Sequence, residues 1–231
     1  MDNKVKKNYS LILEDIISQN KKSGLRPTLL LHACCAPCSS YVLEYLSKHF
    51  EITLLFYNPN ISPKEEFLFR ESELKRLINE MPLPSHINVL TEPYDANEFY
   101  SIAKGLETLS EGGERCKRCY RLRLNRTADI AKKLGFDYFS TTLSISPYKN
   151  AEWLNTIGEK EGLSVGVKYL FSDFKKKNGY KRSCELSEQY GLYRQDYCGC
   201  EFSKAESEKR KKRTSQIKLR RSFFIYPLGN N

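Results

Sequence analysis

Cysteine thiols are the residues of this chain best suited to redox or metal chemistry, and most of its eight cysteines are grouped. Cys34, Cys35 and Cys38 follow a short apolar run. The run 29–33 predicts a buried strand, and the residues from Ser39 onward have the spacing of an amphipathic helix. These thiols therefore lie in a strand-to-helix turn, where α/β folds place ligands and where the helix dipole favours thiolate over thiol. Three small buried cysteines are the alternative interpretation.

A second group of thiols has the spacing of metal ligands. Cys116 and Cys119 form a Cys-x-x-Cys motif at the start of a strongly amphipathic helix. Because both groups lie where a loop enters a helix, both can reach one edge of a sheet, and four thiolates gathered there would hold zinc or an iron–sulfur cluster. A vicinal pair such as Cys34 and Cys35 is unusual for structural zinc, whose ligands are spaced by about two to four residues, so the sequence favours iron–sulfur over zinc.

The segment Cys198-Gly199-Cys200 predicts redox chemistry of a different kind. Two thiols this close cannot easily bind one metal ion tetrahedrally, but they can close a small ring when oxidised, and strained disulfides are the labile, catalytic kind. The preceding segment 193–197 is polar and aromatic, which suits the wall of a pocket. Two surface cysteines near a basic tail are the alternative interpretation. The remaining cysteine, Cys184, stands alone, and we expect it to be structural.

The rest of the chain predicts the scaffold that positions these thiols. Short apolar runs alternate with amphipathic segments, which indicates a three-layer α/β fold with a mostly parallel sheet. We expect an N-terminal helix in residues 1–27, a catalytic α/β domain with a metal site in 28–202 and a basic, helical C-terminal tail in 203–231. The predicted strands are 29–33, 51–57, 87–90, 137–142 and 165–171.

Composition narrows the partners and the compartment. The formal net charge of +10 favours an acidic partner, with nucleic acid the first candidate. The N-terminal segment is amphipathic and unlike a signal peptide, and no apolar run approaches the roughly 20 residues that span a bilayer. We therefore expect a cytoplasmic protein with no membrane partner, whose cysteines serve metal or redox chemistry rather than structural disulfides. A solvated charge run is the alternative for the basic tail residues, which are Lys209, Arg210, Lys211, Lys212, Arg213, Lys218, Arg220 and Arg221.

Six motifs together resemble the QueH-type epoxyqueuosine reductases, and the resemblance runs from about Leu29 to Phe202. They are HACCAPCS at 32–39, YNPNI at 57–61, ERCKRC at 114–119, TTLSISPYKN at 141–150, DFKKKNGY at 173–180 and YRQDYCGC at 193–200. The resemblance implies the last step of queuosine synthesis, in which epoxyqueuosine at the wobble position of a tRNA with a GUN anticodon is reduced to queuosine. The fold it implies is similar to that of the adenine nucleotide α-hydrolases (Rossmann-like).

The resemblance also implies a site. The implied site holds a [4Fe-4S] cluster without cobalamin and a pair of redox-active cysteines. The electron donor of the reaction is unidentified. The family can hold an additional mononuclear iron, whose ligands would include some of these thiols and an acid such as Asp95. The implied cluster ligands are Cys34, Cys35, Cys116 and Cys119, and the implied redox pair is Cys198 and Cys200.

Removal of the epoxide oxygen takes two electrons and two protons and releases water. A dithiol supplies two electrons when it forms a disulfide, whereas a [4Fe-4S] cluster passes one at a time, so the two centres can divide the work. An open iron site that binds the epoxide oxygen as a Lewis acid is the alternative route. Either route needs an acid to protonate the leaving oxygen. The candidates are Asp95, Tyr57 and His32, and the sequence does not rank them.

Two polar loops are candidates for binding the substrate. One follows a predicted strand and opens a helix, which makes an anion site suited to a tRNA phosphate, with an ordinary N-cap turn as the alternative. Its residues are Ser144, Ser146 and Lys149. The other offers stacking and hydrogen bonds to an extruded nucleoside, with a turn built from asparagine and proline as the alternative. Its residues are Tyr57, Asn58 and Asn60.

Two rival functions fit parts of the pattern. A zinc-stapled RNA-binding protein without catalysis would use the same cysteines and the same basic charge. An ATP-dependent tRNA-modifying enzyme of related fold would need a glycine- and serine-rich phosphate loop after the first strand. Residues 32–38 occupy that place here, so nucleotide activation is disfavoured.

Overall fold

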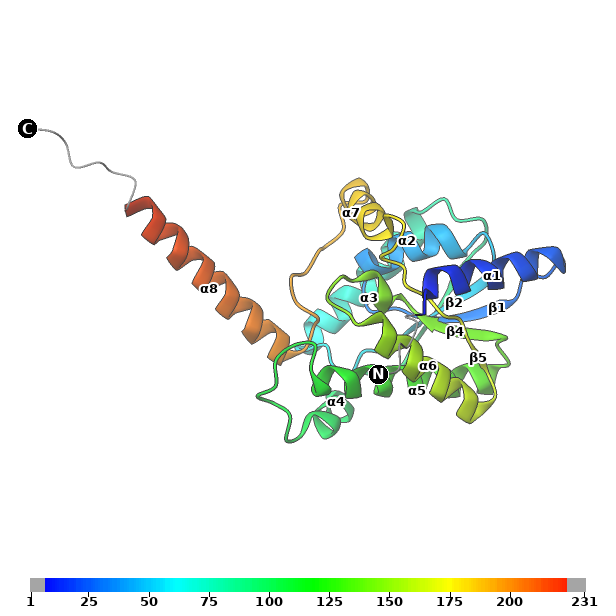
Figure 1. Ribbon diagram of the computed structural model, residues 1–231, viewed down its shortest axis with the longest axis horizontal. Helices are drawn as coiled ribbons and strands as arrows, with labels where there is room; N and C mark the ends of the chain where they lie inside the picture. Colours follow the sequence, from blue (N-terminus) through cyan, green and yellow to red (C-terminus); the bar gives the residue numbers. More distant parts are fainter. Residues whose placement is uncertain (1–6, 224–231) are drawn as a thin grey trace, which may run out of the picture.

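A five-stranded parallel sheet forms the centre of the molecule. The computed structural model describes residues 7–223, with side chains as far as 216 (Figure 1). The strand order is β3-β2-β1-β4-β5, and every neighbouring pair is parallel. The expected α/β fold with a parallel sheet is therefore confirmed. The strands are β1 (Thr28–His32), β2 (Glu51–Phe56), β3 (Asn88–Thr91), β4 (Tyr138–Thr141) and β5 (Lys168–Tyr169).

Helices cover both faces of this sheet. Helices α1, α2 and α3 pack on one face around Leu29, Leu31 and Leu54, and α5 and α6 pack on the other around Leu30 and Phe139. The alternation of the β1 leucines between the two cores is the period-two pattern of a strand buried on both faces. The helices are α1 (Tyr9–Lys22), α2 (Ala36–Leu46), α3 (Lys64–Glu80), α4 (Ala96–Ala103), α5 (Glu114–Leu134), the 3₁₀ helix η1 (Thr142–Ile145), α6 (Ala151–Val165), α7 (Gly179–Gln189) and α8 (Glu201–Phe223).

The carboxyl ends of the strands meet at one edge of the sheet, which is the edge that carries the site. β1 is central, and its last residue, His32, lies between Leu55 of β2 and Thr141 of β4. The chain leaves β1 into the turn that holds the first thiols, and it leaves β4 into η1. This is the edge where open α/β sheets place ligands.

Two elements differ from the sequence expectation. Helix α2 begins at Ala36 rather than near Ser39, because Pro37 fits the first turn of a helix, where no backbone N–H is needed. Strand β5 is two residues long rather than the predicted 165–171, because α6 continues to Val165 and ends on Gly166 in the left-handed conformation.

The C-terminal helix α8 projects away from the α/β body in Figure 1. Its first turns are anchored, with Ser203 and Ser207 buried, whereas residues 208–216 are exposed. The side chains of Lys218, Arg220 and Arg221 lie outside the described residues. None of the described helices is long and apolar enough to cross a membrane.

Candidate functional site

Three thiols lie close together at the turn between β1 and α2. Cys35 is the N-cap of α2, and its Sγ atom lies 3.7 Å from that of Cys34. Cys38 lies in the first turn of α2, and the three Sγ atoms are all within 4.8 Å of one another. Among the described residues, this is the one group of three potential metal ligands with such spacing. The metal ligands expected from the sequence did not include Cys38, although Cys35 and Cys38 themselves form a Cys-x-x-Cys motif.

Polar contacts fix the backbone of this turn. The Ser39 hydroxyl donates to the Cys35 carbonyl at 2.9 Å, and the Asn58 side-chain amide donates to the Ala33 carbonyl at 2.9 Å. Ala33 also donates its N–H to the Leu55 carbonyl at 2.9 Å, which extends the sheet by one residue. The turn is therefore held from both the helix and the neighbouring strand.

These three thiols differ in pKa. Hydrogen bonds from Cys34 and Cys38 lower the pKa of Cys35 well below its usual value. The same contact with Cys35 raises the pKa of Cys34 to about 12, and contacts with Cys34 and Cys35 raise that of Cys38. The expected thiolate at the start of α2 is therefore Cys35, stabilised by two neighbouring thiols.

The second pair of thiols lies in the first turns of α5, as the sequence predicts. The Gly112 N–H donates to the Cys116 Sγ atom at 3.3 Å. Cys119 is buried, and burial raises its pKa to about 12. Cys34, Cys35 and Cys116 belong to the same buried cluster, whereas Cys119 packs in another.

The Cys198-Gly199-Cys200 segment lies between these two groups. Cys198 borders both a large cavity, which the α2 thiols also line, and a small cavity, which Cys116, Cys119 and Cys200 also line. Burial pushes the pKa of Cys198 upward, but the cations of Lys149 and Arg123 outweigh it and the pKa is lowered. Burial and the neighbouring Cys198 raise the pKa of Cys200. The surroundings therefore favour the thiolate form more at Cys198 than at Cys200.

The large cavity has a volume of about 430 Å³ and thiols on one wall. The facing walls come from the loop after η1, from the start of α7 and from the segment 194–197, which confirms that most of the predicted polar and aromatic segment is a pocket wall. Aromatic rings and cations border the same space. They are Tyr148, Tyr180, Tyr197, Lys149, Arg194 and Arg210.

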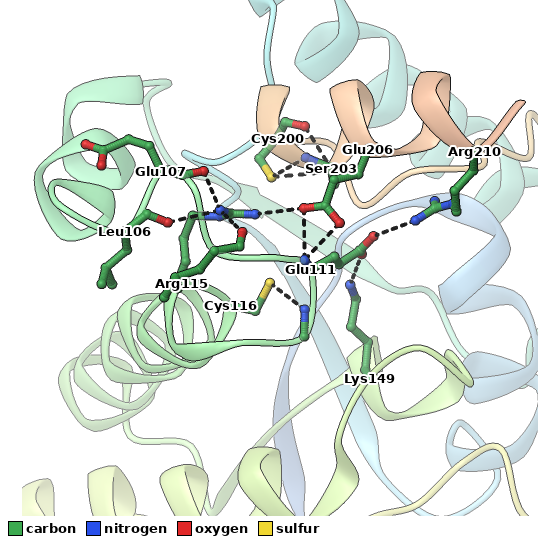
Figure 2. A network of polar contacts seen from close by, with 12 residues as sticks. Leu106, Glu107, Glu111, Arg115, Cys116, Lys149, Cys200, Ser203, Glu206 and Arg210 are labelled. Carbon is green, nitrogen blue, oxygen red and sulfur yellow. Dashed lines mark hydrogen bonds and ion pairs between the residues drawn. The ribbon is translucent and has the colours of Figure 1, made fainter. Parts of the chain in front are cut away.

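A polar network ties the base of α8 to this cavity (Figure 2). The buried ammonium of Lys149 lies 3.0 Å from the Glu111 carboxylate, and the Arg210 guanidinium lies 4.0 Å from the same carboxylate. The Glu111 backbone N–H donates to Glu206, whose carboxylate also pairs with the buried Arg115 at 3.3 Å. The loop before α5 and the first turns of α8 are therefore held together by charged groups beside the thiols.

Some predicted substrate residues line the large cavity and others do not. Ser146 and Lys149 line it. The buried Ser144 hydroxyl instead lies 3.0 Å from that of Ser172 and accepts from the Phe174 N–H, so it stabilises the loop. Of the three residues expected to form an anion site at this loop, Ser146 and Lys149 therefore line the large cavity and Ser144 does not.

The second predicted substrate loop supports the scaffold. Tyr57 donates its hydroxyl to Glu98, and Asn58 is buried with its amide on Ala33. Asn60 is buried beside the small cavity, where its Oδ1 atom has no hydrogen-bond partner. The alternative interpretation, a turn built from asparagine and proline, describes this loop better than nucleoside stacking does.

The three candidate proton donors also lie away from the large cavity. Asp95 is exposed and caps α4 by accepting from the Asn97 N–H at 2.9 Å. His32 is buried with one ring nitrogen 2.9 Å from the Thr141 hydroxyl and the other 3.0 Å from the Tyr57 carbonyl, and burial lowers its pKa to about 3. Burial and the Glu98 contact raise the pKa of the Tyr57 hydroxyl. None of the three lines either cavity.

Comparison with known proteins identifies the family. Residues 29–206 match the family model described as "Epoxyqueuosine reductase QueH". The chain is 42% identical over 198 residues to an epoxyqueuosine reductase QueH of Streptococcus pyogenes serotype M1, covering 85% of this chain and 78% of that protein. It is 37% identical over 200 residues to one of Thermotoga maritima, covering 84% of this chain and 97% of that protein. The chain therefore belongs to the epoxyqueuosine reductase QueH family.

Proposed function

We propose that this protein is an oxidoreductase that reduces epoxyqueuosine to queuosine at the wobble position of tRNA. The observation that supports it most is the large cavity, which has room for a nucleoside and places Cys198 and three further thiols beside it. A nucleoside within a folded tRNA must be turned out of its stack to enter such a cavity. The substrate is inferred from membership of the family, and the cavity is where we expect the reaction to take place.

An iron–sulfur cluster fits the donor set of this site. Cys34, Cys35, Cys116 and Cys119 are buried thiols at one edge of the sheet, and we assign them as the cluster ligands. The guanidinium of Arg123 is buried beside the small cavity and leaves its Nη2 atom without a partner, as expected where an anionic group belongs. When bound, a [4Fe-4S] cluster supplies single electrons.

The α2 thiols also suit a single ion. Three Sγ atoms within 4.8 Å of one another can share one metal, and Cys38 adds a thiol beyond the four assigned to the cluster. A mononuclear iron held by this group would therefore share Cys34 and Cys35 with the cluster, in line with the shared thiols that the sequence resemblance implies. Iron analysis separates this arrangement from a zinc staple.

The redox pair does the two-electron chemistry. We assign Cys198 and Cys200 as the dithiol that is oxidised to a disulfide while the epoxide carbons become an alkene. Two thiol hydrogens leave with the epoxide oxygen as water, so one disulfide forms for each queuosine. Lys149 and Arg123 lower the pKa of Cys198 against the effect of burial, which favours the nucleophilic form of this thiol at the cavity wall.

Binding of the nucleoside is assigned to the remaining walls. Tyr148, Tyr180 and Tyr197 offer ring faces for stacking, and the ammonium of Lys149 can donate a hydrogen bond to the oxygen that leaves. The exposed lysines and arginines of α8 continue from the rim at Arg210 and suit the phosphates of a tRNA stem.

The test is an anaerobic assay of the purified chain on tRNA that contains epoxyqueuosine, read by mass spectrometry of the digested nucleosides. Conversion to queuosine, with iron and acid-labile sulfide in the protein, is the expected result. Zinc without iron, and tRNA that binds but stays unconverted, would instead identify the RNA-binding alternative. A Tyr197→Ala variant should weaken substrate binding, whereas Tyr100→Ala, an exposed tyrosine on α4 that lines neither cavity, should not.

A further inference from the structure

Arg123 is a buried cation with no carboxylate partner among the side chains that the structure describes. It lies on α5 one turn after Cys119 and is 1% exposed. Its Nε atom donates to the Cys119 carbonyl at 3.4 Å, and its Nη2 atom has no hydrogen-bond partner. Removing a guanidinium from water is costly when no counter-charge balances it and one of its donors stays unpaired.

The two other arginines buried to this degree are paired. Arg70 lies 2.7 Å from the Glu66 carboxylate, and Arg115 lies 3.3 Å from the Glu206 carboxylate. Arg115 also donates to the carbonyls of Leu106, Glu107 and Leu109. Each of these two arginines also has one buried nitrogen without a partner, so Arg123 differs from them in charge balance rather than in hydrogen bonding.

The small cavity beside Arg123 has no carboxylate in its lining. The thiols of Cys116, Cys119, Cys198 and Cys200 line it, together with the uncharged side chains of Asn60 and Tyr120 and with Arg115, which pairs with Glu206. The nearby buried lysine, Lys149, already has Glu111 as its counter-ion, so that carboxylate does not serve Arg123. The Asn60 amide can accept a hydrogen bond but carries no charge, so a negative charge that balances Arg123 must come from these thiols or from a group that they bind.

We propose that Arg123 is a positioning residue for the iron–sulfur cluster: its guanidinium donates to cluster or cysteinyl sulfur and raises the reduction potential of the cluster. This inference rests on the proposed function, because it needs the cluster assigned there. Hydrogen bonds to sulfur and nearby positive charge are established means by which proteins set cluster potentials. A higher potential makes the reduced cluster easier to form from a given electron donor.

The experiment is a redox titration of the anaerobically purified holoprotein, followed by the electron paramagnetic resonance signal of the reduced cluster. Arg123→Met and Arg123→Gln remove the charge, and Arg123→Lys keeps it without the planar fork of donors. The control is Arg126→Gln, which removes an exposed arginine one turn further along α5, where Arg126 pairs with Glu92 in solvent. The uncharged variants should lower the equilibrium constant for cluster reduction at least tenfold, about 59 mV for one electron, and the control should leave it unchanged.

Wild-type potentials in both uncharged Arg123 variants would overturn the proposal. Should both fold without iron, the Arg123→Lys variant decides, because a cluster below the wild-type potential supports the proposal and a cluster at the wild-type potential overturns it. Failure of the proposed function looks different. A wild-type protein without iron and sulfide rejects the cofactor itself, whereas an active wild type with insensitive Arg123 variants rejects only this role of Arg123.

Discussion

The ammonium of Lys149 lies 3.0 Å from the carboxylate of Glu111, and both side chains are largely removed from water at the wall of the cavity that holds Cys198. The pair joins the loop before α5 to the loop before α6, two segments far apart in the sequence. It also keeps a positive charge near Cys198, which lowers the pKa of that thiol.

Breaking this pair on one side should be costly. Glu111→Gln leaves the Lys149 charge buried without its carboxylate, so the free energy of unfolding should fall by about 3 kcal/mol. The double variant Glu111→Gln with Lys149→Met should recover most of that loss, because it removes both charges and keeps the volume. Urea denaturation of the two single variants and the double variant measures the coupling. Strictly additive losses would show that the two side chains do not stabilise each other.

The backbone at Gly199 should tolerate no side chain. Its φ is +123°, and a Cβ atom there would lie 3.0 Å from the Ile61 Cγ1 atom and 3.1 Å from the Arg70 Nη1 atom. Gly199→Ala should cost about 2–3 kcal/mol and displace the thiols of Cys198 and Cys200. Gly191→Ala is the matched control, since its φ of +55° is less strained and a Cβ atom there has open space, so about 1 kcal/mol is expected. Equal losses in urea denaturation would contradict the packing argument at Gly199.

Burial of His32 should make stability depend on pH. Its pKa is lowered by burial from 6.5 to about 3, so the folded chain stays unprotonated where the unfolded chain binds a proton. The stabilisation is complete above pH 6.5 and is lost as the pH falls toward 3, amounting to about 2 kcal/mol between pH 7.5 and pH 5. Urea denaturation of the metal-free protein across this range measures the slope. The His32→Gln variant should lack this component, and an identical slope in both proteins would contradict the assignment.

The exposed cations of α8 should carry a salt-dependent part of tRNA binding. A Lys209→Gln, Lys212→Gln, Arg213→Gln variant should bind tRNA more weakly and reduce the slope of log affinity against log salt by about 2–3. The control removes Lys132 and Lys133, which lie at the opposite end of α5, about 24 Å from Cys116 along the helix. Filter binding at several salt concentrations compares the two. A greater loss of slope in the control would place the tRNA elsewhere.

Features that depend only on neighbouring residues could be predicted from local patterns in the sequence. The turn at Cys34 and Cys35 and the helix that has Cys116 and Cys119 in its first turns both lie where the sequence predicts them. Each depends on the preferences of a few consecutive residues, such as an apolar run followed by proline or a polar side chain before a helix.

Features made by distant segments could not be predicted in this way. The pairing of Lys149 with Glu111 and the buried position of Arg123 arise only when α5, α6 and α8 pack together. One signal for Arg123 was present, because it shares the apolar face of α5 with Tyr120 and Thr127, where helical spacing predicts burial. No sequence pattern indicated where the Tyr57 hydroxyl lies, because the Glu98 side chain that accepts its hydrogen bond is on another segment, helix α4.

A single-turnover reaction tests the central claim most directly. The reduced protein is mixed anaerobically with epoxyqueuosine tRNA without any added reductant, and the nucleoside and the cysteine peptides are both analysed by mass spectrometry. The account predicts one queuosine for each disulfide formed between Cys198 and Cys200, and no queuosine from a Cys198→Ser variant. Queuosine produced while both thiols remain open to alkylation would contradict it.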